Sequence, residues 1–86
     1  MANTPTTNEL WRRYRTAERR RDTAARRVKW LEAFVMLSTS QAEFENRNSQ
    51  LEAALDEVEA AGAEAMKARI AYNTADLAER FNYPQA

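Results

Sequence analysis

Between Pro5 and Pro84 the chain contains no proline and a single glycine, Gly62. Proline and glycine interrupt helices and make the tight turns of β-hairpins, so a long segment almost without them favours helices and lacks β-turn signals. No part of the segment alternates apolar and polar residues with the β-branched enrichment of a strand. The sequence therefore predicts an all-α protein.

Two capping boxes mark where helices begin. Residues 6–9 (TTNE) and 40–43 (SQAE) each place a hydroxyl three positions before a glutamate, so the hydroxyl can accept a hydrogen bond from the glutamate amide. The hydroxyl-rich residues 38–40 separate the two runs. The chain is therefore expected to be a single domain over 1–86, with helices over about 7–37 and 40–81, a flexible arm over 1–6 and a tail over 82–86.

Each predicted helix carries an apolar stripe. In the first, positions spaced alternately by four and three form a heptad seam: Leu10, Tyr14, Ala17, Arg21, Ala24, Val28, Leu31 and Val35. In the second, large apolar residues recur every eleven positions, which gives a nearly straight stripe: Phe44, Leu55, Met66 and Leu77. The stripes predict a long antiparallel helical hairpin with coiled-coil-like packing. Arg21, a charged residue in the seam, is expected to select register at some cost in stability.

Charge is divided between the two halves. Residues 1–37 carry nine basic and four acidic side chains, and residues 38–86 carry four basic and nine acidic ones. Folding the chain at residues 38–40 so that facing positions sum to about 79 places Ala17 against Gly62. The same register predicts three interhelical ion pairs: Arg27 with Glu52, Arg20 with Glu59, and Arg13 with Glu64.

A hairpin of this size buries too little apolar surface to be stable alone. The predicted register also leaves residues 70–81 without a partner on the first helix. This overhang either folds back as a third helix, breaking near Gly62 or Asn73, or is covered by a second chain. The second alternative is favoured because the eleven-residue stripe continues through Gly62, and it predicts a homo-oligomer. The expected partner or oligomer interface consists of two groups: Trp30, Phe34 and Leu37, and Ile70, Leu77 and Phe81.

The composition argues against catalysis. The chain has no cysteine and no histidine, so it has no thiolate, imidazole or Ser-His-Asp chemistry. Glu52, Asp56 and Glu59 share one helix face and could attract a hard cation. We expect instead that these carboxylates form an ordinary solvated surface. We therefore expect no enzyme activity, no catalytic residues, no cofactor and no metal. The most apolar stretch, residues 30–37, is far shorter than a membrane span, which predicts a cytoplasmic protein that has no membrane contact and lies in the host cytoplasm if virus-encoded.

Two binding functions remain. Aromatic residues dominate protein interfaces, so Trp30 and Phe34 form either a recognition patch or a contact buried in the fold or in a homodimer. Both alternatives favour a non-catalytic protein–protein interaction module. Such a chain suits a small assembly component or an accessory inhibitor of the type that phages and mobile elements encode. The alternative is a nucleic-acid-associated protein that uses the arginine-rich first helix. The candidate contacts for an acidic partner or for nucleic acid are Arg12, Arg15, Arg19 and Arg26.

Overall fold

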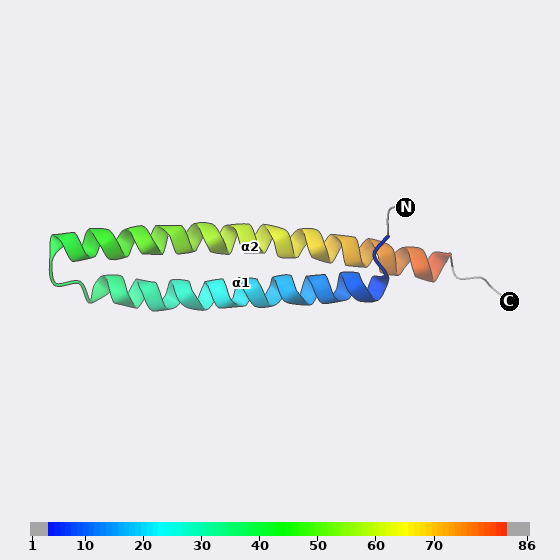
Figure 1. Ribbon diagram of the computed structural model, residues 1–86, viewed down its shortest axis with the longest axis horizontal. Coiled ribbons are helices and arrows are strands. Elements are labelled where there is room, and N and C mark those ends of the chain that lie inside the picture. The colour runs from blue at the N-terminus through cyan, green and yellow to red at the C-terminus, as the bar shows by residue number, and fades with distance from the viewer. Residues whose placement is uncertain (1–3, 83–86) are drawn as a thin grey trace.

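The structure of the protein, a computed structural model that describes residues 4–82, is an antiparallel hairpin of two long helices (Figure 1). Helix α1 spans Thr7–Met36 and helix α2 spans Gln41–Phe81. The predicted fold class is confirmed, and both helices begin and end within one residue of the predicted bounds. Most of the predicted arm and tail, residues 1–3 and 83–86, lies outside the described residues.

At both helix N-termini the hydroxyl of the predicted capping box accepts its hydrogen bond. The Thr6 hydroxyl accepts a hydrogen bond of 3.1 Å from the Glu9 amide, and the Ser40 hydroxyl accepts one of 3.1 Å from the Glu43 amide. At the end of α1, the Leu37 amide donates to the carbonyls of Ala33 and Phe34. These local bonds satisfy backbone groups that a helix end leaves free, and they confine the turn to residues 37–40.

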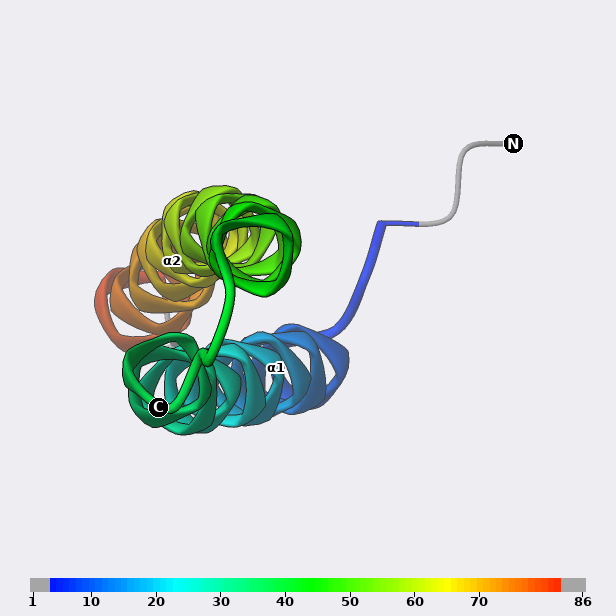
Figure 2. The ribbon, with the colours of Figure 1, turned by 90° about the vertical axis from the view of Figure 1, so that its left-hand side faces the viewer.

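The seam of α1 is the predicted heptad. Five of its positions are buried: Ala17, Ala24, Val28, Leu31 and Val35. The end-on view shows the two helices crossing as they run along each other, as in a coiled coil (Figure 2). Arg21 occupies its seam position, but about half of its side chain is exposed and its guanidinium lies 3.8 Å from Asp22.

The seam of α2 differs from the prediction. Its buried residues are alanines, Ala54, Ala61 and Ala65, and half-buried residues continue the same four-three spacing: Leu51, Val58, Ala68, Tyr72 and Ala75. The predicted eleven-residue stripe of Phe44, Leu55, Met66 and Leu77 is exposed instead. The prediction was wrong because it followed the largest apolar side chains, whereas small alanines occupy the seam of α2.

This seam moves the register by about one helical turn. Gly62 lies against Arg21 rather than Ala17, since a Cβ on Gly62 would be 4.0 Å from Arg21 Cδ. Farther along, the rings of Trp11 and Tyr72 have centroids 5.0 Å apart. The Thr7 hydroxyl donates a hydrogen bond to Glu79. The predicted overhang of residues 70–81 is therefore mostly alongside α1, and α2 continues without a break through Gly62 and Asn73.

The same shift changes the partner of Arg20. Its guanidinium lies 3.1 Å from a carboxylate oxygen of Glu57 and 2.8 Å from one of Glu64. The predicted partner, Glu59, is exposed and forms no ion pair with Arg20. The ion pairs predicted for Arg13 and Arg27 do not occur within residues 4–82. Arg20 therefore joins the helices by contacting two glutamates that lie two turns apart on α2.

Reversing this charge is expected to destabilise the hairpin slightly. Arg20→Glu should lower the free energy of unfolding, and adding Glu57→Arg should restore roughly 0.2–1 kcal/mol, because the pair is solvent-exposed. Urea unfolding of the single and double variants gives the coupling energy. Glu59→Arg is the control, and recovery from Glu59→Arg but not from Glu57→Arg would contradict the observed register.

Replacing Gly62 by alanine is expected to stabilise the protein. Gly62 lies inside α2, has no positive φ, and a Cβ there would make ordinary van der Waals contact with Arg21. Glycine in a helix costs roughly 0.5–1 kcal/mol relative to alanine, so Gly62→Ala should raise the melting temperature by about 4–8 °C per kcal/mol gained. A thermal melt followed by circular dichroism measures this, and a lower melting temperature would show that the helices need the space.

Candidate partner-binding surface

The predicted aromatic group lies at the turn end of the hairpin. Trp30 and Phe34 are one helical turn apart on α1, and their rings stack with centroids 4.8 Å apart and planes 23° from parallel. Phe34 is half-buried against the cluster of Val28, Leu31 and Ala54, whereas Trp30 is 62% exposed. The core therefore positions Phe34, and Phe34 in turn positions an indole ring that faces solvent.

Arg47 of α2 completes the stack. Its guanidinium carbon lies 3.7 Å from the centre of the Phe34 ring, and its Nη1 donates a 3.0 Å hydrogen bond to the Phe34 carbonyl oxygen. Its Nη2 lies 2.5 Å from a carboxylate oxygen of Glu43. Since Trp30 already stacks on Phe34, the guanidinium takes the other face of that ring. Arg47 thus fixes Phe34 from the opposite helix, and sequence reasoning missed this contact.

We call Trp30, Phe34 and Leu37 the turn-end surface, because their spacing by four and three places them on one side of α1 next to the turn. Leu37 is 71% exposed at the C-terminal end of α1. Met36 is 85% exposed but lies on another side of the helix, because it is only two residues from Phe34. Large aromatic and aliphatic side chains that remain exposed next to a core are typical of protein interaction sites.

The second predicted group lies at the other end of the hairpin. Ile70 and Leu77 lie near the part of α2 where Tyr72 contacts Trp11, and Phe81 lies in the last turn of α2, which extends beyond the start of α1 (Figure 1). All three are exposed. The structure therefore does not join the six predicted interface residues into one surface within a single chain. With Met66, the first two form what we call the outer stripe of α2: Met66, Ile70 and Leu77.

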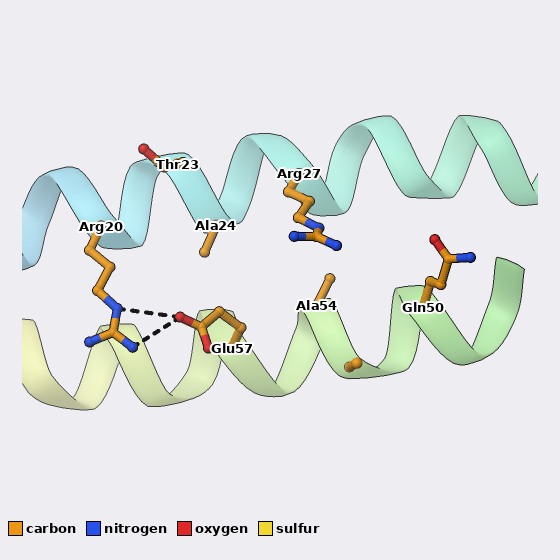
Figure 3. Close-up of a pocket in the computed structure, with 8 residues that line it drawn as sticks. Arg20, Thr23, Ala24, Arg27, Gln50, Ala54 and Glu57 are labelled. Carbon is orange, nitrogen blue, oxygen red and sulfur yellow. Dashed lines mark hydrogen bonds and ion pairs between the residues drawn. The ribbon is translucent and has the colours of Figure 1, made fainter.

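A shallow groove runs between the helices beside the seam (Figure 3). The residues that line it come from both helices: Arg20, Thr23, Ala24 and Arg27 of α1, and Gln50, Ala53, Ala54 and Glu57 of α2. It holds about 530 Å³ and is open to solvent. Glu57, the carboxylate that lines this groove, is engaged by Arg20 (Figure 3). The groove thus combines small side chains with the charge of Arg27, which has no ion pair within residues 4–82.

The structure divides the four candidate arginines. Arg15 pairs with Glu18 at 3.1 Å and lies over the Trp11 ring, so its charge is partly used within α1. Arg12, Arg19 and Arg26 are exposed at seven-residue spacing and have no ion pair within residues 4–82. These three arginines remain available to an acidic partner.

No protein-family model, no curated protein and no solved structure matches the chain. Across residues 4–82, neither helix has a stretch that combines the length and the apolar character of a membrane span. In the same residues, the acidic side chains form no group of three arranged to hold a metal ion. The geometry of the side chains therefore carries the functional argument.

Proposed function

We propose that this protein is a non-catalytic protein-binding module that contacts its partner through the turn-end surface. The observation that carries the proposal is the stack of Trp30 on Phe34, whose ring Arg47 also contacts, because this stack presents a largely exposed indole to solvent. An aromatic side chain that is already fixed before binding loses little conformational entropy in a complex, and this favours affinity. A small assembly component or an accessory inhibitor would use such a surface.

A second candidate function is association with nucleic acid through Arg12, Arg19 and Arg26. It is supported by their exposure and by the lack of an ion pair for each within the described residues. The zero formal net charge of the chain weighs against it, because a nucleic-acid-binding domain usually carries a basic excess. Protein binding is therefore the preferred function.

Binding measurements on two variants separate these functions. Affinity capture from cells that express the protein should recover one specific partner protein. Trp30→Ala should lower the affinity for that partner by about 30-fold or more, as expected for a central aromatic anchor. Changing the three free arginines to glutamine should mainly slow association. Trp11→Ala, which removes an exposed tryptophan at the other end, is the matched control.

The opposite ranking would contradict the proposal. A nucleic-acid binder would tolerate Trp30→Ala, would lose binding with the arginine variant, and would show a salt dependence that falls by about one unit for each phosphate contact removed. Its recovery would also be sensitive to nuclease. Circular dichroism on each variant shows first that its helix content is unchanged.

A further inference from the structure

We infer that the partner of the turn-end surface is a second copy of this chain, whose α2 lies parallel to α1 along their outer faces. The inference rests on the proposed function, because it names the protein that covers the same surface. The outer face of each helix is the one opposite its seam, and each outer face is exposed along its length. Charge, apolar pattern and exposed area each support the contact.

The charges on the two outer faces are complementary in spacing as well as in sign. Three arginines without an ion pair in residues 4–82 lie seven positions apart on α1: Arg12, Arg19 and Arg26. Three exposed glutamates, also without an ion pair there, lie seven positions apart on α2: Glu45, Glu52 and Glu59. Each arginine is 33 positions before one glutamate. Two parallel helices with this offset would therefore align all three pairs.

The same offset aligns the apolar residues that follow. It places Trp30 against the small Ala63 of the other copy. Two turns farther it places Leu37 against Ile70, and between these pairs it places Ala33 against Met66. A large side chain thus meets a small one twice, and two aliphatic side chains meet once, as packing of helix surfaces requires. The end of α1 would then cover Met66 and Ile70, two of the three residues in the outer stripe of α2.

Other registers fit less well. Moving the partner by one heptad in one direction places Arg26 against Met66, and moving it in the other direction places Ala33 against Glu59. Reversing the direction of the partner helix keeps the three charge pairs but places Trp30 against Gln41, the first residue of α2, and Leu37 beyond the start of that helix. The parallel offset of 33 is therefore the register in which the charges and the apolar side chains agree.

The exposed area of the chain is consistent with two such contacts. The chain exposes 7099 Å², whereas a compact protein of 9.9 kDa exposes about 5,200 Å². Divided between the two outer faces, the excess of about 1,900 Å² is close to the roughly 800 Å² per partner of a standard protein interface. Covering both faces would give this chain the buried surface that its small seam lacks.

The position of the two faces sets the kind of assembly. The outer face of α1 and the outer face of α2 point away from each other in one hairpin, because each lies opposite the shared seam. One copy therefore contacts one neighbour through α1 and another neighbour through α2. Such a contact is heterologous and produces a ring or a filament rather than a closed two-fold dimer.

Paired cysteines test the register in a chain that has no cysteine of its own. Within one chain Ile70 lies near the start of α1, so Leu37 and Ile70 are separated by roughly 35 Å of helix and cannot form an internal disulfide. Under mild oxidation, Leu37→Cys with Ile70→Cys should produce chains linked in series on a non-reducing gel. Two control pairs report the neighbouring registers: Leu37→Cys with Ala63→Cys, and Leu37→Cys with Leu77→Cys. Equal linkage in all three pairs, or none in the first, would overturn the inference.

Charge reversal tests the contact without cysteine. One variant carries Arg12→Glu, Arg19→Glu and Arg26→Glu, and the other carries Glu45→Arg, Glu52→Arg and Glu59→Arg. In sedimentation velocity at micromolar concentration, after nuclease treatment, each variant alone should be a folded monomer, and an equal mixture should recover the assembly of the unchanged protein. An unchanged protein that is monomeric, or that assembles only when RNA or DNA is added, would overturn the inference. The capture experiment with Trp30→Ala would then still decide the proposed function, because a different protein would have to cover the turn-end surface.

Discussion

Replacing Leu31 by alanine is expected to lower the free energy of unfolding by roughly 2–5 kcal/mol. Leu31 is 1% exposed and is the one large side chain that is fully buried within residues 4–82. It lies in the cluster of Val28 and Ala54, with Phe34 and Leu51 packed around it. Much of the remaining seam consists of alanines, which bury little surface, so the loss should be a large share of the total stability.

The measurement is urea unfolding followed by circular dichroism at a fixed chain concentration, where the midpoint should fall without a change in slope. Leu55→Ala is the matched control, since Leu55 has the same side chain but is about half exposed on α2. Its cost should be about 0.5 kcal/mol. If both variants lost the same stability, Leu31 would not be the centre of the core.

The sequence was sufficient to predict α1 and both helix starts. Leucine and valine at heptad positions give a strong periodic signal, and Val28, Leu31 and Val35 are buried as this signal requires. Thr6 and Ser40 cap their helices because each hydroxyl needs only a backbone amide three residues away. These features depend on neighbours in the chain, so they can be read from local spacing.

The seam of α2 and the register could not be predicted in this way. Alanine has a small apolar surface and also forms helices well at exposed positions, so Ala54, Ala61 and Ala65 do not differ in sequence from the exposed Ala60. The prediction therefore assigned the buried face of α2 from the large side chains of Leu55 and Met66, which are exposed. The facing helix selects the alanine face, and that choice depends on contacts distant in sequence.

The candidate site was predicted in part. The four-residue spacing of Trp30 and Phe34 placed both rings on one side of α1, and the structure stacks them. The contact of Arg47 with Phe34 was missed, because an arginine at a seam position carries no sequence signal for the ring that it covers.

Introducing a charge at Ala65 should produce the second large effect. Ala65 is 3% exposed in the seam of α2. The aspartate side chain is too short to carry its carboxylate out of the seam. Ala65→Asp would therefore bury a negative charge that has no cationic partner. The expected loss is roughly 3 kcal/mol or more in the free energy of unfolding, with a matching loss of helix content near the transition.

Ala60→Asp is the control because Ala60 lies five residues earlier on the exposed side of the same helix. It introduces the same residue with the same charge, so it should cost no more than the difference in helix propensity, about 0.7 kcal/mol. The ratio between the two losses measures how strongly the alanine seam is packed. If Ala65→Asp were as mild as Ala60→Asp, the seam of α2 would be hydrated, and the exposed residues Leu55 and Met66 would have to supply the contact with α1 by a rotation of the whole helix.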